Sequence, residues 1–181
     1  MKFETYKYIP KKEIKNAAIL AGMFICAAAA LWIASVFIGN SGNSGIIKII
    51  YLFSGVIIAT AAIQVTTRFI MCGYIYILDK TDFIIVRASG AKSVRVCDIN
   101  LETAIAIIEP EKNKKTADVE KQFGRKTIKM NFCQNLFSDK IYSYIFEYDG
   151  KKSLIRFEGD ENFIAEMKTR VEYAKSGLEI D

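Results

Sequence analysis

The sequence predicts a transmembrane helical hairpin followed by a small, mainly β soluble domain of the α+β class. Three observations carry this prediction: two long apolar runs, short strand-like segments after them, and one amphipathic segment near the C-terminus. The 32 residues from Asn16 to Ile47 contain no charged side chain, and the 19 residues from Ile49 to Thr67 contain none either. Because about 18 apolar residues suffice to cross a bilayer, each run is long enough for a membrane span.

The two runs divide the chain of 181 residues into an anchor and a domain. A secretory signal peptide is the alternative for the first run, with a cleavage site at Ala27–Ala30. The apolar run continues through Trp32 to Ile38, longer than a signal peptide needs, which favours a retained span. The predicted parts are a basic cytoplasmic tail (1–15), a transmembrane hairpin (16–71, with spans at about 17–39 and 46–70), a domain (74–176) and a short tail (177–181).

Charge placement predicts the orientation. The first 15 residues hold five lysines, whereas the connector Asn40–Gly45 holds none. The positive-inside rule therefore places the N-terminus and the C-terminal domain in the cytoplasm of a multi-pass protein of the cell membrane. From Tyr74 onward 18 basic residues balance 18 acidic ones, so the net charge of +5 lies beside the spans. A nucleic-acid partner is not expected, because such a domain would carry a basic surface.

Small residues recur four apart in both spans, a spacing that lets helices approach closely in lipid. One interpretation is that the two spans pack on each other, and the other is that they also form a dimer face. Pore or carrier function is not expected, because ionisable side chains are missing from the middle of the spans. The small residues are Gly22, Cys26, Ala30 and Ala34 in the first span and Gly55 and Ala59 in the second.

Short strand-like segments separated by turns follow the hairpin. The clearest turn is Asp149-Gly150, typical of a type I′ β-hairpin. Its register pairs Tyr142 with Phe157, Tyr144 with Ile155 and Phe146 with Ser153 on an aromatic face. The other face, which pairs Glu147 with Lys152 and Ser143 with Arg156, is expected to be polar. The predicted strands are 74–79, 83–88, 93–97, 103–109, 126–133 and the two arms of this hairpin, seven in all.

An amphipathic helix is predicted after Gly159. Asp160 is suited to the N-cap, and the apolar residues then recur on one side only, so the helix should lie on the sheet. These residues are Phe163, Ile164, Met167, Val171 and Ala174, and Lys175-Ser176-Gly177 ends the helix.

The order of these elements resembles the pleckstrin-homology-like (PH-like) fold of small bacterial membrane proteins with two spans before the domain. The resemblance rests on the strand pair YIYILDKTDFIIVRA, the hairpin YSYIFEYDGKKSLIRF and the helix DENFIAEMKTRVEYA. It implies two sheets of seven strands in all, packed nearly orthogonally as a sandwich or barrel that the last helix caps. A lipocalin-like or other small barrel is the structural alternative.

Function is predicted by class rather than by reaction. The chain has no histidine, its four cysteines form no CxxC pair, and phosphate-loop and nucleophile motifs are missing. We therefore expect no metal, no cofactor and no enzyme activity. The expected function is a membrane-anchored binding or scaffolding module. Its partner would be a protein, or a second copy of the chain, at an exposed strand edge or in the groove beside the last helix.

Two alternatives remain at this stage. The first is an anionic-lipid-sensing domain that uses basic residues of the 112–129 loop, namely Lys112, Lys114, Lys115, Lys121, Arg125, Lys126 and Lys129. Inositol phosphate binding at Lys80-Thr81 is disfavoured, because Asp79 and Asp82 flank that turn. The second alternative is an enzyme of unknown class, which would need a cluster of polar side chains inside the barrel.

Overall fold

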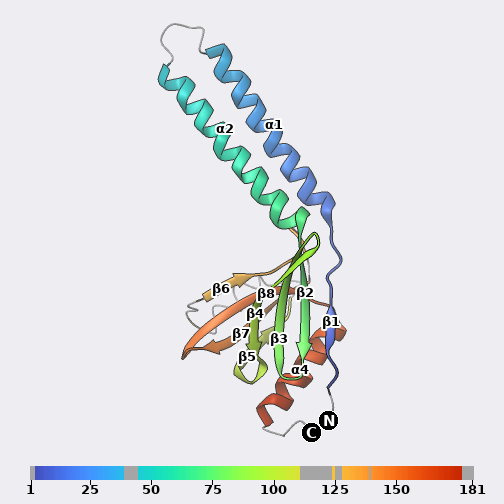
Figure 1. Ribbon diagram of the computed structural model, residues 1–181. Helices are drawn as coiled ribbons and strands as arrows, with labels where there is room; N and C mark the ends of the chain where they lie inside the picture. Colours follow the sequence, from blue (N-terminus) through green and yellow to red (C-terminus); the bar gives the residue numbers. More distant parts are fainter. Residues whose placement is uncertain (1–2, 39–44, 111–123, 125–127, 139, 177–181) are drawn as a thin grey trace. The chain divides into compact units, whose positions relative to one another are not determined.

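A computed structural model describes residues 3–38, 45–110, 124, 128–138 and 140–176 (Figure 1). The chain forms two compact units. One unit is the segment Glu13–Cys72, and the other combines Met1–Lys12 with Gly73–Asp181. We call the first the hairpin and the second the domain.

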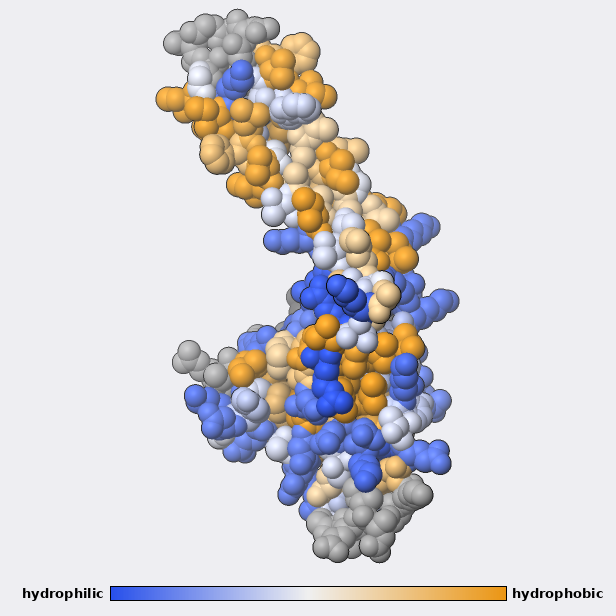
Figure 2. Space-filling view, in the orientation of Figure 1, coloured by the Kyte–Doolittle hydropathy of each residue, from blue (hydrophilic) through white to orange (hydrophobic). Residues whose placement is uncertain are grey.

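The hairpin consists of α1 (Ile14–Ile38), α2 (Gly45–Val65) and a π-helical end, η1 (Thr66–Met71). By length and composition, Ile14–Phe37 and Gly45–Met71 can each cross a membrane, which confirms two span-like helices where the sequence predicted them. The first begins three residues earlier than predicted. Large apolar side chains are exposed along both helices, including Phe37 (74%) and Ile46 (78%), and Figure 2 shows this apolar surface. Such a surface suits contact with lipid.

The two helices pack along a seam with alternating steps of four and three residues, the spacing of a left-handed helix pair. A side chain added at Gly55 would lie 3.6 Å from the Ala28 carbonyl oxygen, so Gly55 permits close approach. Gly22, by contrast, has open space around it, and Cys26 and Ala30 are exposed. The structure therefore supports the hairpin-packing interpretation at Gly55 but not at Cys26 and Ala30, while Gly22, Ala34 and Ala59 are half-buried. The buried or half-buried seam residues are Ala17, Ala21, Phe24, Ala28, Leu31 and Ser35 in α1 and Tyr51, Gly55, Ile58, Ala62, Val65 and Phe69 in α2/η1.

In the part of the domain that the structure describes, two four-stranded sheets and one α-helix form an α+β layout, as predicted. Sheet A has the order β1-β2-β3-β4 and sheet B the order β5-β7-β8-β6. The strands of sheet A are β1 (Tyr6–Tyr8), β2 (Cys72–Asp79), β3 (Asp82–Ser89) and β4 (Lys92–Asn100). After η2 (Leu101–Thr103) come β5 (Ala104–Ile108), β6 (Ile128–Asn131), β7 (Ile141–Tyr148), β8 (Lys151–Glu158) and α4 (Glu161–Ser176).

Strand β1 corrects the assignment of residues 1–15 to a tail. It pairs antiparallel with β2, Tyr6 opposite Leu78 and Tyr8 opposite Tyr76, so the described domain has eight strands rather than seven. Three residues are too few to show a strand period, and the partner strand lies beyond the whole hairpin in sequence. The chain before the first span is therefore part of the domain.

The β7–β8 hairpin has the predicted register at every pair, and Asp149 (φ 52°) and Gly150 (φ 68°) form the predicted turn. Its second face is mixed rather than wholly polar, since the predicted pairs Glu147–Lys152 and Ser143–Arg156 share it with an apolar pair. Ile145 and Leu154 are buried there and cluster with Ile108. Strand β6 ends at Asn131, two residues before the predicted end, where the Asn131 side chain accepts a hydrogen bond from Cys133 N (2.9 Å); the predicted residues 126 and 127 lie outside the described residues.

The domain core is aromatic, and Phe163 of α4 lies at its centre. Its ring centroid is 5.2 Å from Tyr8, 6.2 Å from Tyr76 and 6.2 Å from Phe157, so one helical residue contacts both sheets. The predicted N-cap is confirmed, since the Asp160 carboxylate accepts a hydrogen bond from Phe163 N (2.7 Å). The helix therefore covers the core, as the one-sided apolar pattern predicted.

Candidate binding groove

A groove of about 190 Å³ runs between β5 and α4. Among the described residues, strand β5 pairs with β7 alone, so it lies at an edge of sheet B. Lys168 forms an ion pair with Glu109, which follows β5. The groove is lined by Ala104, Ile105, Ala106 and Ile107 of β5 and by Lys168, Val171, Glu172 and Lys175 of α4. It is thus apolar along the strand and charged along the helix.

This arrangement suits an extended segment of polypeptide. An edge strand offers backbone N–H and C=O groups for pairing, while an adjacent apolar groove takes alternate side chains of the added segment. The helix contributes two ammonium groups and one carboxylate, so it favours neither strongly acidic nor strongly basic segments. The sequence analysis anticipated this groove but not the residues of β5 that line it.

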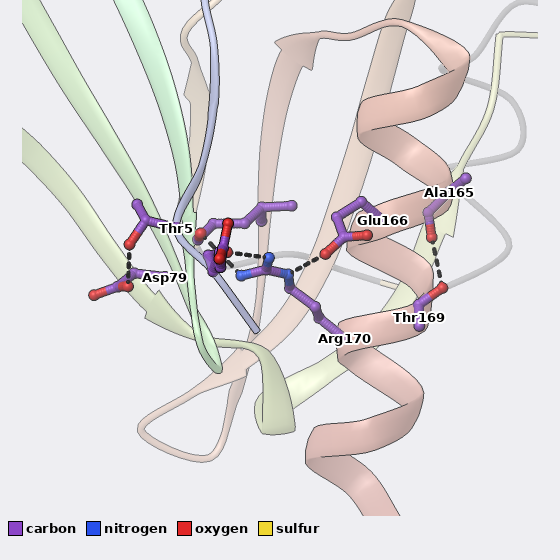
Figure 3. A network of polar contacts seen from close by, with 8 residues as sticks. Thr5, Asp79, Ala165, Glu166, Thr169 and Arg170 are labelled. Carbon is purple, nitrogen blue, oxygen red and sulfur yellow. Dashed lines mark hydrogen bonds and ion pairs between the residues drawn. The ribbon is translucent and has the colours of Figure 1, made fainter. Parts of the chain in front are cut away.

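Arg170 joins the N-terminal segment to the rest of the domain (Figure 3). Its side chain is 2% exposed, and its guanidinium donates to Glu166 (2.7 Å), to the Leu78 carbonyl (2.9 Å) and to the Glu4 carbonyl (2.6 Å). The guanidinium also lies 4.9 Å from the ring centroid of Phe3. Sequence reasoning missed this residue. The available signal was its position between Met167 and Ala174, on the apolar side of the helix.

A second polar network holds the segment Phe132–Asn135, which we call the clamp segment. Gln134 Oε1 accepts the backbone N–H of Tyr74 (2.7 Å), and the Tyr76 hydroxyl donates to the Phe132 carbonyl (2.9 Å). The clamp segment therefore fixes the first residues of the domain after the hairpin.

The same segment also fixes the chain just before the hairpin. The Asn135 side chain donates to the Lys11 carbonyl (2.9 Å) and to the buried Glu158 carboxylate (2.8 Å). Glu158 also accepts the backbone N–H of Asn135 (2.8 Å). Both chain connections of the hairpin are thus attached to one short segment, of which only Phe132 and Cys133 were predicted, as the end of a strand.

Carboxylates dominate the β2–β3 turn, where Lys80 (φ 45°) confirms the predicted reversal of the chain. Burial raises the pKa of Asp82, and the neighbouring Asp98 and Asp79 raise it further against the opposing effect of Arg95. A phosphate group would add negative charge to this site. The local charge therefore disfavours inositol phosphate, as the sequence indicated.

Of the seven basic residues expected to contact lipid, Lys129 lies exposed on β6. Lys112, Lys114, Lys115, Lys121, Arg125 and Lys126 lie outside the described residues. Within the described ranges, no group of three or more Cys, Asp or Glu side chains is arranged to hold a metal ion. Comparison of the chain with protein-family models, curated proteins and solved structures finds no match.

Proposed function

We propose that the protein is a non-enzymatic, membrane-anchored binding or scaffolding module that presents a PH-like domain at the cytoplasmic face. The observation that carries the proposal is the groove between β5 and α4, where β5, an edge strand among the described residues, borders an apolar surface. The partner would be a protein segment in extended conformation, or a second copy of the chain.

Membrane anchoring in hairpin topology is supported by the exposed apolar side chains of α1 and α2. It is also supported by the β1–β2 pairing, because residues on both sides of the hairpin share one sheet. Strands of one sheet must lie on the same side of a membrane, which requires an even number of crossings. The lysines before α1 favour the cytoplasmic side.

A binding role rather than catalysis is supported by the interior of the domain. The main core is apolar and aromatic, and three buried polar side chains hold backbone groups in place: Arg170, Gln134 and Glu158. The PH-like assignment is supported by two four-stranded sheets followed by a helix whose Phe163 contacts both.

Site-specific photo-crosslinking in cells tests the proposal. A benzophenone amino acid at Glu172, which lines the groove, should give a discrete crosslinked product. The same amino acid at Lys151, exposed at the β7–β8 turn, serves as the control and should give none. Equal products at both positions, or none at Glu172, would contradict a binding role for the groove.

A further inference from the structure

Two large apolar side chains of the domain are exposed close to the chain connections of the hairpin. Phe137, two residues beyond Asn135, is 68% exposed, and Ile9, two residues before Lys11, is 60% exposed. Asn135 and Lys11 are themselves joined by a hydrogen bond of 2.9 Å. The exposed basic residues Lys11 and Lys140 lie in the same stretches of chain. Apolar and basic side chains together are typical of surfaces that enter lipid headgroups.

Chain length limits how far these residues can be from the membrane helices. Lys11 precedes Ile14, the first residue of α1, by three residues, and Tyr74 follows Met71, the last residue of η1, by three. Three residues span at most about 11 Å. Side chains of the clamp segment are bonded to the backbone of both Lys11 and Tyr74, so this segment is tied to the chain three residues from each helix end. With the hairpin anchored in the membrane as proposed above, those helix ends reach the headgroup region, which is roughly 5–8 Å deep.

We infer that the domain itself binds the lipid surface, through Phe137 and Ile9 as apolar contacts and the exposed Lys11 and Lys140 as partners of anionic headgroups. The occupant of this surface is the bilayer that the hairpin crosses. The inference rests on the membrane anchoring proposed above but is independent of the β5–α4 groove. It also uses residues other than the basic 112–129 loop. Its consequence is a domain held against the membrane rather than hanging freely from two linkers.

Tryptophan quenching in nanodiscs tests this surface with the full chain. The chain has one tryptophan, Trp32, in α1, so Phe137→Trp in a Trp32→Phe background reports on the proposed contact alone. In nanodiscs containing anionic phosphatidylglycerol and lipids brominated at shallow acyl positions, we expect blue-shifted emission and roughly twofold quenching. Tyr148→Trp in the same background is the matched control, because Tyr148 is 61% exposed at the far end of β7. It should be neither shifted nor quenched.

Trp32 in the unmodified chain separates the two ways in which the experiment can fail. Quenching of Trp32 together with equal, weak quenching at positions 137 and 148 would overturn the lipid surface while leaving the anchor intact. Absence of quenching at Trp32 would overturn the anchor, and the inference with it. Replacement of Lys11 and Lys140 by glutamine should reduce quenching at position 137. Unchanged quenching would remove the lysines from the proposal.

Hydrogen exchange on the unmodified protein gives a second readout that needs no substitution. Amides of residues 134–138 should exchange more slowly in anionic nanodiscs than in neutral detergent, whereas those of the β7–β8 turn should not change. Equal rates for residues 134–138 in the two environments would count against the inference.

Discussion

The two sheets of the domain differ in how their strands are connected. Sheet B is built from one continuous stretch, β5 to β8, and its central pair is a tight hairpin. Sheet A takes β1 from before the membrane hairpin and β2 to β4 from after it. Closing β1 onto β2 brings together residues separated by the entire hairpin, at an entropic cost that grows slowly with length. Sheet A therefore combines three strands that follow one another in sequence, β2 to β4, with one pairing across the entire hairpin. Sheet B combines the local β7–β8 pair with the β5–β7 and β6–β8 pairings, which join strands that are not consecutive in sequence.

The largest loss of stability is expected at Phe163 of α4, whose ring contacts both sheets. Phe163→Ala removes the ring that contacts Tyr76 of sheet A and Phe157 of sheet B, and should lower the free energy of unfolding by about 3–5 kcal/mol. Chemical denaturation of the detergent-solubilised protein measures this loss. Phe137→Ala, at an exposed ring, is the control and should change stability by less than about 0.5 kcal/mol. Equal losses in both variants would contradict a core centred on Phe163.

The next largest effect is expected at Arg170 and should be confined to sheet A. Arg170→Met leaves the carbonyls of Leu78 and Glu4 without their buried donor, and should cost about 3 kcal/mol. Hydrogen exchange should show faster exchange in β1 with little change in β7 and β8. Arg95→Met, which breaks an exposed ion pair with Asp98, should cost less than about 1 kcal/mol. Uniform loss of protection in both sheets would argue that Arg170 does not act through β1.

Two buried tyrosines, one in each sheet, provide a further comparison of sheets A and B. The Tyr76 hydroxyl of sheet A donates to the Phe132 carbonyl (2.9 Å), and it accepts the Glu158 N–H (3.4 Å). The Tyr144 hydroxyl of sheet B has no partner among the described residues. Tyr76→Phe should therefore cost about 1–2 kcal/mol, whereas Tyr144→Phe should be neutral or stabilising. Denaturation midpoints compare the stability of the two variants. A greater loss of stability for Tyr144→Phe would contradict the difference in hydrogen bonding between the two hydroxyls.

The smallest expected effect is a pH-dependent change in stability at Asp82. Because burial and the nearby carboxylates raise the pKa of Asp82 in the folded state, its charged form destabilises the fold above that pKa. Asp82→Asn should thus stabilise the protein slightly at pH 7, by about 0.5 kcal/mol or less. The gain should disappear as pH falls below about 4, where Asp is protonated in both states. A gain that is the same at both pH values would point to packing instead of charge.

Sequence patterns predicted the parts of the fold that local interactions determine. The β7–β8 register follows from one turn and the alternation beside it, and α4 follows from Asp160 and a one-sided apolar pattern. Strand β1 could not be predicted, because three residues carry no period and their partner is distant in sequence. The groove was predicted by its place beside the last helix. The clamp segment was missed, because its polar residues bond chain segments that only the tertiary fold brings together.

The pairing of β1 with β2 is the central claim, and a disulfide across it tests it most directly. Thr5 and Asp79 oppose each other at the end of this pair, and their side chains are hydrogen-bonded at 2.8 Å. Opposed antiparallel residues have Cα separations of about 4.5–5.5 Å, within the range for a disulfide. In Thr5→Cys/Asp79→Cys with a protease site in the connector 40–45, the cleaved halves should stay joined in one monomer until reduced. Thr5→Cys/Ser93→Cys is the control and should separate. Separation of the halves in both variants, or joining only between different copies, would contradict a domain closed by its own N-terminal strand.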